Sequence, residues 1–302
     1  MIEFTEDELN EKLDRLIEIL CDDEEIDIDS FNLDSLGLAD KRMIFRGLSN
    51  QRQPKQLDSE FIKLQDEILS YERDHRNIFD VKTFTYHHGM TIFEGDITTL
   101  KADAIVNAAN SKMLGSFEPC EPSIDNVIMS AGGLQIRQDL DYLMKQQGHP
   151  EPNGRAKLTK GYNLPAKYII HTVGPMILDR VSYRDKIDLA NCYKSCLNLA
   201  AQADFKNIVF CSISTGVYKF PREQASIIAV ETVSKWLKET QSNLKVVFCV
   251  FSDYDKKLYE ERFKEYNLLW EWKLSFDMTG KIILVFKFCQ IWKLFKGKLK
   301  RL

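Results

Sequence analysis

The sequence lacks long hydrophobic runs, paired cysteine motifs and a large net charge. No apolar run approaches the roughly 20 residues of a membrane-spanning helix. The seven cysteines among 302 residues form no CxxC pair and no Cys/His cluster. We interpret them as reduced, mostly buried thiols of an intracellular protein, which we place in the cytoplasm. The net charge of -4 gives no general case for nucleic-acid binding. The acidic start, MIEFTEDELNE, predicts no signal peptide.

The first part of the chain has helical periodicity. Apolar residues recur at helical spacing over residues 6–21, 41–48 and 58–73, and Thr5 can cap the first of these segments. We therefore expect a helical N-terminal region, residues 1–80. So short a region has difficulty burying its own core, so we expect it to pack on the domain that follows.

From Phe84 onward, short strands alternate with helices. Segments rich in β-branched and aromatic residues predict strands over residues 91–94, 104–107, 156–160, 168–173, 207–211 and 245–251. Helices are expected over residues 125–130, 135–147, 185–203, 223–239 and 253–266. This alternation is typical of an α/β domain, which we place at residues 81–267, with a largely parallel sheet buried between helices. Ligands of such sheets bind beyond the C-terminal strand ends, where residues 107–110 and 212–218 lie.

The C-terminal segment, residues 268–302, differs from the rest in composition. From Trp270 it carries eight Lys and Arg against Glu271 and Asp277, a local net charge of +6. It also holds seven of the aromatic residues, but its run IILVFKFCQIW is too short and too interrupted to span a bilayer. Three interpretations stay open: an element packed on the domain, an appendage, or an interfacial segment for an anionic membrane.

Two polar residues follow predicted strands and are candidates for ligand binding. Asp96 ends an apolar strand, where its carboxylate can accept a hydrogen bond from a donor such as an adenine amino group. The alternative is that Asp96 caps the turn at residues 97–99. Asn110 ends the run NAAN, whose small alanines let a ligand approach, and its amide offers both a donor and an acceptor. The alternative is a left-handed turn residue that leaves the strand.

The stretch SISTGVYKFP, residues 212–221, predicts a phosphate-binding loop. Its turn follows an apolar strand, and free backbone N–H groups there can cradle phosphate oxygens without a lysine. No GK[ST] follows, so it is not a P-loop. Tyr218 supplies a ring on which a ribose or base can rest. The alternative is an ordinary strand-to-helix loop closed by Pro221.

Asp125 follows the loop 115–123 at a predicted helix start. It is either a helix cap or, opposite a diphosphate loop, a carboxylate that orients or deprotonates a water. His171 lies among apolar residues in YIIHTV, and we interpret it as a core or loop-anchoring histidine.

Five separated motifs come in the order of a macrodomain, and the sequence resembles this family. They are Asp96-Ile-Thr, NAAN ending at Asn110, SIDNVI around Asp125, HTVGP at residues 171–175 and STGVYKFP at residues 214–221. The helical N-terminal region, LGSFEP and NLPAKYIIHTVGP are similar to the zinc-dependent macrodomain protein-ADP-ribose hydrolases. The resemblance covers residues 1–267. It implies a three-layer α/β/α sandwich with a mixed, largely parallel sheet that binds ADP-ribose in a cleft.

The resemblance also implies residue roles. Asp96 would hold the adenine with Ile97 packed beside it, and Asn110 would contact the distal ribose. Asp125, preceded by Ile124, would lie near the scissile anomeric carbon. The diphosphate would be cradled by Ser214, Thr215, Gly216 and Val217. The ring of Tyr218 would lie against a ribose. The implied reaction is hydrolysis of a mono-ADP-ribosyl group from a protein side chain, a glycosidase-type reaction with Asp125 and Asn110 as catalytic residues.

One loop departs from the pattern of those hydrolases. Their loop resembles GCFxPxHxCIDN, whose Cys, His and Cys bind zinc; here the three positions hold Ser116, Glu121 and Ser123. Neutral serines are poor zinc ligands, and the adjacent Cys120 and Glu121 are badly placed to chelate one ion, so we expect no metal and no cofactor. Two functions stay open: a hydrolase that works without zinc through Asp125, or an ADP-ribose-binding module that lost turnover with its zinc site. A third possibility is a degenerate copy with a damaged loop and an altered C-terminal tail.

Overall fold

The structure is a computed structural model that describes residues 3–271 and, of their side chains, those of residues 3–266. Contacts divide the chain into a unit Met1–Tyr259 and a unit Glu260–Leu302. The helix α8 (Asp253–Glu271) begins in the first unit, to which every other helix and strand belongs. No helix among residues 3–271 is long and apolar enough to cross a membrane. The interpretations of the basic, aromatic C-terminal segment concern side chains outside the described residues.

Three helices form the N-terminal region: α1 (Glu6–Glu24), α2 (Leu38–Gln51) and α3 (Ser59–Asp74). Thr5 caps α1 as predicted and forms a capping box with Glu8. Two short 3-10 turns, Ile28–Phe31 and Leu33–Ser35, connect α1 to α2. The apolar stripes of the three helices bury a common cluster, which Leu134 from the following domain completes. The region therefore buries more of a core than its length predicts, and it also packs on the domain that follows.

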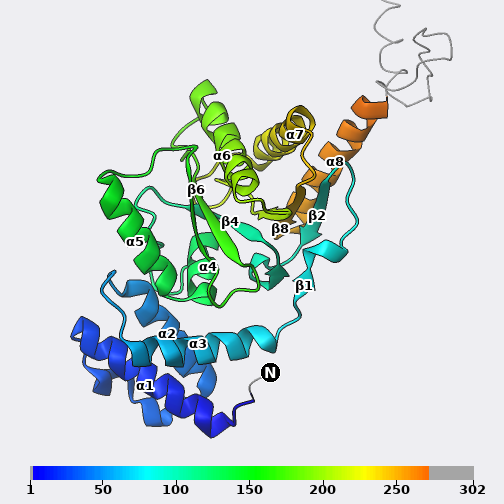
Figure 1. The fold of residues 1–302 in the computed structure, drawn as a ribbon. Coiled ribbons are helices and arrows are strands. Elements are labelled where there is room, and N and C mark those ends of the chain that lie inside the picture. The colour runs from blue at the N-terminus through cyan, green and yellow to red at the C-terminus, as the bar shows by residue number, and fades with distance from the viewer. Residues whose placement is uncertain (1–2, 272–302) are drawn as a thin grey trace, which may run out of the picture. The chain divides into compact units, whose positions relative to one another are not determined.

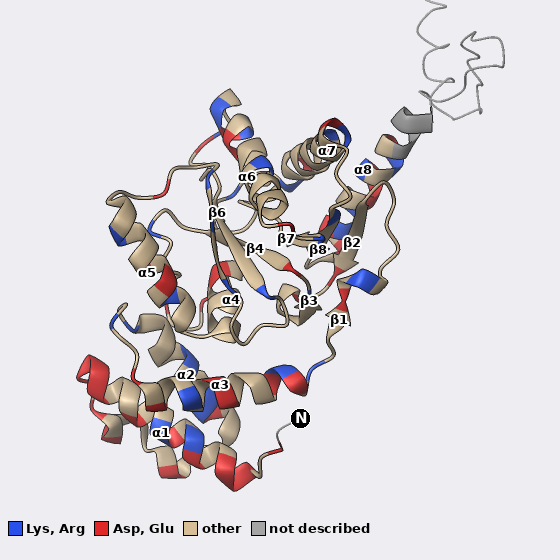
Figure 2. Ribbon diagram, in the orientation of Figure 1, with Lys and Arg blue, Asp and Glu red and all other residues tan. Residues whose placement is uncertain are grey.

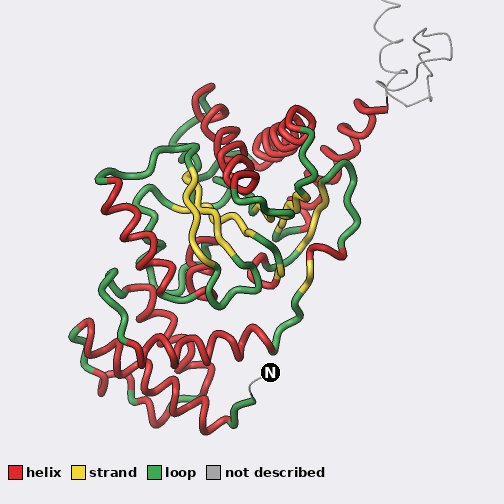
Figure 3. Tube along the Cα trace, viewed as in Figure 1, coloured by secondary structure: helices red, strands yellow, loops and turns green. Residues whose placement is uncertain are grey.

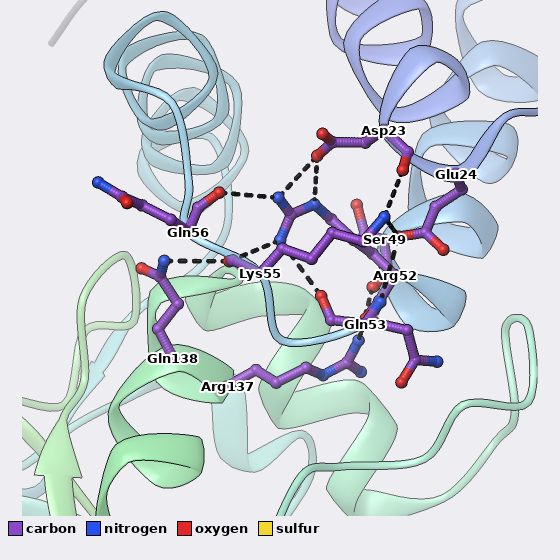
Figure 4. Close-up of polar contacts among 9 residues, drawn as sticks. All are labelled: Asp23, Glu24, Ser49, Arg52, Gln53, Lys55, Gln56, Arg137 and Gln138. Atoms are coloured by element: carbon purple, nitrogen blue, oxygen red, sulfur yellow. Dashed lines mark hydrogen bonds and ion pairs between the residues drawn. The ribbon is translucent and has the colours of Figure 1, made fainter.

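Two buried arginines lie where α2 meets the helix α5 (Gln135–Gln147) (Figure 4). Arg52 pairs with Asp23 and donates to backbone carbonyls within residues 53–56. Arg137 points from α5 toward the end of α2 and donates to the carbonyls of Ser49 and Arg52. The last carbonyls of a helix have no intrahelical partner, so Arg137 both satisfies them and fixes α2 against α5.

The central sheet has six strands in the order β2-β8-β7-β4-β6-β5. Their bounds are β2 (Met90–Glu94), β8 (Lys245–Val250), β7 (Asn207–Phe210), β4 (Ala104–Ala109), β6 (Tyr168–Val173) and β5 (Ala156–Lys160). Neighbours are parallel except β5, which is antiparallel to β6. This confirms a mixed, largely parallel sheet. A second, two-stranded sheet of β1 (Phe79–Asp80) and β3 (Leu100–Lys101) was not expected from the sequence.

Helices cover both faces of the central sheet (Figure 1). On one face, α6 (Tyr183–Gln202) packs on α7 (Arg222–Thr240) and contacts β5, β6 and β7. On the other, α4 (Ile124–Gly132) contacts β4, and α5 contacts β5. The inner strands β4, β6 and β7 carry no Lys, Arg, Asp or Glu, whereas these residues gather on the helices, most densely on α1 to α3 (Figure 2). The predicted three-layer sandwich with an N-terminal helical region is confirmed.

The five parallel strands end at one edge of the sheet, and the connecting loops that leave this edge carry the polar residues discussed below (Figure 3). The residues that lie at or just beyond these strand ends are Asp96, Asn110, Gly174, Ser212 and Phe251. Side chains far apart in the sequence thus meet in one place because their strands are parallel neighbours.

Candidate active site

Asp125 lies in the first turn of α4. The helix begins at Ile124, and its cap is Ser123, whose hydroxyl accepts from the Asn126 N–H at 3.3 Å. The alternative that Asp125 is the helix cap is therefore wrong. The Asp125 side chain is 6% exposed, and its Oδ1 accepts from Nδ2 of Asn107 at 2.7 Å. Burial raises the pKa of Asp125 to about 6 despite this hydrogen bond. A carboxyl with such a pKa can take up a proton near neutral pH.

Asp96 caps the 3-10 turn η4 (Ile97–Thr99), so the capping alternative is confirmed. Its Oδ1 accepts from the backbone N–H and the hydroxyl of Thr98, and its Oδ2 pairs with Arg76 at 2.5 Å. Burial alone would raise the pKa of Asp96, but these donors outweigh it and leave the pKa below its usual range. Oδ2 keeps lone-pair capacity, so Asp96 stays a fixed anionic acceptor next to the buried Ile97.

An open cavity of about 540 Å³ adjoins Asp96. Arg76, Phe79 and Phe93 are among the residues that line it. Phe251 also lies near Asp96, because the Gly95 N–H donates to the carbonyl of Val250, the residue before Phe251. The Phe251 side chain is 84% exposed. An exposed ring beside an anionic acceptor offers a nucleobase both a stacking surface and a hydrogen-bond partner.

Phe251 was missed by the sequence reasoning, which made it the last residue of a strand at residues 245–251. The strand ends one residue earlier, at Val250, and this turns the ring out to solvent. The rule that ligands bind beyond parallel strand ends, which selected Asn110, would also have selected Phe251. Arg76 gave no comparable signal, because it lies in the connection after α3.

Asn110 closes the turn that follows β4. Its Nδ2 donates to the carbonyl of Gly115 at 3.0 Å, and its Oδ1 accepts from the Lys112 N–H at 2.9 Å. The residue with left-handed backbone here is Met113, with φ of 63°, so the left-handed alternative for Asn110 is wrong. A primary amide has two N–H groups and two carbonyl lone pairs. Asn110 therefore retains one donor and one acceptor site for a ligand.

The loop 212–220 is held by its own backbone. The Lys219 N–H donates to Gly216, and the Phe220 N–H donates to Ser214. Thr215 turns its hydroxyl back onto the Ser212 carbonyl at 2.9 Å. Within the described residues, the backbone N–H groups of residues 216–218 donate to no protein acceptor. They are available to oxygens of an anion.

Ser214 bends the loop 212–220 with a left-handed backbone, φ of 65°. Its hydroxyl lies so close to Gly174 that a Cβ there would come within 2.0 Å of it, so this contact requires glycine. Val217 is 63% exposed, and the Tyr218 carbonyl accepts from the Ile177 N–H at 2.8 Å. Burial and the negative charge of Asp125 raise the pKa of Tyr218, so its phenol lies within electrostatic reach of Asp125.

The loop 111–123, by contrast, is held by side chains from other elements. Asn50 of α2 accepts from the Cys120 N–H at 2.9 Å, and Arg46 donates to the Glu121 carbonyl. Arg137 donates to the carbonyls of Leu114 and Ser116, and its guanidinium stacks on the ring of Phe117 at 4.6 Å. The helical N-terminal region thereby contacts the loop that leads into Asp125.

The residues of the loop 111–123 do not fit a zinc ion. The hydroxyl of Ser123 accepts from Asn126 as the α4 cap and donates to Glu121 at 2.9 Å. Ser116 accepts from the Glu118 N–H, and the thiol of Cys120 donates to the Met43 carbonyl. No group of three His, Cys, Asp or Glu among the described residues could hold a metal. A zinc site needs three good donors, and this loop offers hydroxyls that are already engaged.

Comparison with known proteins identifies the family. The Macro domain family profile matches residues 106–229. A protein of Staphylococcus aureus (strain MRSA252) named Protein-ADP-ribose hydrolase is 50% identical over 223 residues, 73% of this chain and 84% of the relative. A Treponema medium protein of that name is 46% identical over 227 residues, 74% of this chain and 87% of the relative. The structure of the Oceanobacillus iheyensis macrodomain with ADP is 34% identical with a TM-score of 0.55, over 60% of this chain and 92% of that one. The chain belongs to the macrodomain family.

Proposed function

We propose that the chain binds ADP-ribose and hydrolyses mono-ADP-ribosyl groups from protein side chains. The observation that carries the proposal is the buried Asp125, with its pKa raised to about 6 by burial, near the sheet edge at which the loop 212–220 begins. The bond that forms joins a water oxygen to the anomeric carbon, while the bond from that carbon to the protein side chain breaks. Asp125 accepts the proton of the water and then gives this proton to the departing side chain, which restores the carboxylate.

The remaining residues account for binding. Asp96 accepts from the adenine amino group with Ile97 beneath it and Phe251 beside it. The free N–H groups of the loop 212–220 hold the diphosphate, and Tyr218 lies against a ribose. Asn110 uses its remaining donor on the distal ribose. ADP in the Oceanobacillus iheyensis structure and the names of the relatives support ADP-ribose as the ligand.

We further propose that the reaction does not use zinc. The basis is the donor set: Ser116 and Ser123 are neutral hydroxyls engaged within the loop, and Glu121 has no second strong donor placed with it. In place of a metal, buried hydrogen bonds and the α4 N-terminus set the position and charge of Asp125.

The second candidate function is an ADP-ribose reader without turnover. The replaced residues at positions 116, 121 and 123 favour it, because a lost Lewis acid slows the chemical step while binding is kept. The free thiols of the six described cysteines support an intracellular, cytoplasmic location for either function.

One experiment separates these proposals. Wild type and Asp125→Asn are incubated with a mono-ADP-ribosylated protein, with and without a chelator, and ADP-ribose release is followed. The hydrolase proposal expects chelator-resistant release that the substitution reduces by about a thousandfold. Binding of ADP-ribose by calorimetry with no release from wild type identifies a reader. Release that is sensitive to the chelator would contradict the zinc-free reaction. No heat of binding at millimolar ADP-ribose would contradict both the hydrolase and the reader function.

A further inference from the structure

A line of buried polar side chains crosses three strands beneath Asp125. Asn107 on β4 and His171 on β6 are direct partners in the parallel register, so their side chains share one face of the sheet. Lys157 of β5 lies opposite His171, and Thr159, two residues on, shares that face as a diagonal neighbour. The helix α4 lies over this face and brings Asp125 onto Asn107. Asn107 and His171 are 0% exposed and Thr159 is 4% exposed.

The donors and acceptors along this line fit in only one direction. An ionised Asp125 accepts only, so Asn107 presents its NH2 group to it, at 2.7 Å. The second N–H of that group faces Nδ1 of His171 at 3.1 Å, and Nδ1 must therefore be unprotonated. The ring proton then lies on Nε2 and is donated to Thr159 Oγ1 at 2.9 Å. The Thr159 hydroxyl in turn donates a hydrogen bond to the Lys160 carbonyl at 3.2 Å.

Two observations support a role of this arrangement at Asp125 rather than at Asn107 itself. The Oδ1 atom of Asn107 is buried and has no hydrogen-bond partner among the described residues. An unpaired buried oxygen is unfavourable, and rotating the amide would redirect it toward the histidine. In addition, burial lowers the pKa of His171 to about 3, so the ring is neutral and its tautomer is set by its neighbours alone.

We propose that Asn107 is a positioning residue for Asp125, and that Thr159 fixes the orientation of its amide by holding the tautomer of His171. The consequence for the reaction rests on the proposed function. Without the Thr159 hydroxyl, the Nε2 proton has no acceptor, and the tautomer with the proton on Nδ1 becomes favoured. That proton is donated to the Asn107 oxygen, so the amide rotates. An oxygen then faces the Asp125 carboxylate, and Asp125 loses its donor.

The variant that tests this is Thr159→Val, which removes the hydroxyl while keeping the shape of the side chain. We expect kcat for ADP-ribose release to fall about thirtyfold while KM stays within about twofold, because a hydrogen bond to a charged group is lost indirectly. Thr159→Ser restores the hydroxyl and should restore kcat. The matched control is Thr172→Val, since Thr172 is also a buried sheet threonine with its hydroxyl on a backbone carbonyl, that of Arg155 at 2.7 Å. It should leave kcat within about twofold.

The tautomer is read independently of activity by ¹⁵N NMR of histidine-labelled protein, with the His171 signals assigned from their loss in His171→Gln. Wild type and Thr159→Ser should show the proton on Nε2, and Thr159→Val should show it on Nδ1. Wild type with the proton on Nδ1 would overturn the inference even if no release is seen. A changed tautomer with unchanged kcat would also overturn it, while leaving the hydrolase function intact. If the expected tautomers are seen but no ADP-ribose is released, the proposed hydrolase function is wrong, whereas the proposed orientation of the Asn107 amide by Thr159 and His171 is retained.

Discussion

The two loops that flank the site are held in place by different means. The loop 212–220 closes on itself through backbone hydrogen bonds within a few residues and leaves N–H groups free at its tip. The loop 111–123 has a longer, irregular course, and its carbonyl and N–H groups are taken up by Asn50, Arg46 and Arg137. The loop 212–220 is therefore stabilised mainly by its own backbone, whereas the loop 111–123 is stabilised by side chains of α2 and α5.

This difference shows which part of the site depends on the N-terminal region. The loop 212–220 needs its strand, its helix and the neighbouring segment 174–177, where Gly174 lies against Ser214 and the Ile177 N–H donates to the Tyr218 carbonyl. The loop 111–123 needs α2 and α5 in their observed positions, because its partners come from both. The resemblance described above implies that positions 116, 121 and 123 correspond to the zinc ligands of the zinc-dependent hydrolases. Here protein donors hold that loop.

The largest expected effect tests the anchored loop through Arg137→Met. Its guanidinium serves four backbone carbonyls, those of Ser49, Arg52, Leu114 and Ser116. Because buried carbonyls would lose their donors, we expect the free energy of unfolding to fall by about 4 kcal/mol. Denaturant unfolding measures this. The control Arg15→Met removes a half-exposed arginine paired with Glu60 and should leave the free energy of unfolding nearly unchanged, because surface ion pairs contribute little. Equal losses would contradict the anchoring role.

The same difference decides what the sequence could predict. The six central strands agree with their predicted segments to within two residues, because β-branched runs form strands locally. The loop 212–220 was recognisable because Gly216 and its neighbours are contiguous. The contact of Cys120 with Asn50 spans 70 residues, and no periodicity encodes it. Asn107 lies inside NAAN, but its role depends on the strand register with His171, which only the folded sheet supplies.

A second prediction concerns the stability cost of Asp125. In the unfolded chain its pKa is 3.8; in the folded protein it is about 6, so folding favours the protonated form. Its contribution to stability is complete below pH 3.8 and is lost as the pH rises through 6. This difference in the pKa of Asp125 between the unfolded and folded states corresponds to about 3 kcal/mol in the free energy of unfolding. Asp125→Asn should therefore be more stable than wild type by up to about 3 kcal/mol at pH 8 and equal to it near pH 4.

Urea unfolding of Asp125→Asn and wild type across this pH range gives the measurement. The control Asp179→Asn changes a carboxylate that is 93% exposed and should show no such pH dependence. A pH-independent difference between Asp125→Asn and wild type would mean that the buried carboxyl keeps an ordinary pKa. The loop 111–123 would then lead into a site whose carboxylate, Asp125, has no raised pKa.

The third prediction tests the self-contained loop. A Cβ at Gly216 would meet no atom within 4 Å, so we expect Gly216→Val to fold normally and to project into the space that a diphosphate would occupy. We expect Kd for ADP-ribose to rise about thirtyfold, about 2 kcal/mol, with Tm unchanged. Gly37→Val is the control, since Gly37 also has open space around its Cβ position. Asn50→Ala should do the reverse, lowering Tm while Kd changes by about threefold at most. If Gly216→Val and Asn50→Ala both change Kd, or both change Tm, the two loops are not independent.

The smallest expected effect extends the comparison to the end of β8. Phe251 neither anchors a loop nor closes one; its ring is exposed beside Asp96. Stacking on a base is worth about 1–3 kcal/mol, and an exposed single-sided stack belongs at the lower end, so Phe251→Ala should raise Kd for ADP-ribose about fivefold. Phe251→Tyr keeps the ring and should keep Kd. Tyr142→Ala removes another exposed ring, on α5, and should have no effect. If Phe251→Ala binds like wild type, the adenine is held by Asp96 and its neighbours alone, and the exposure of the ring has a cause outside this site.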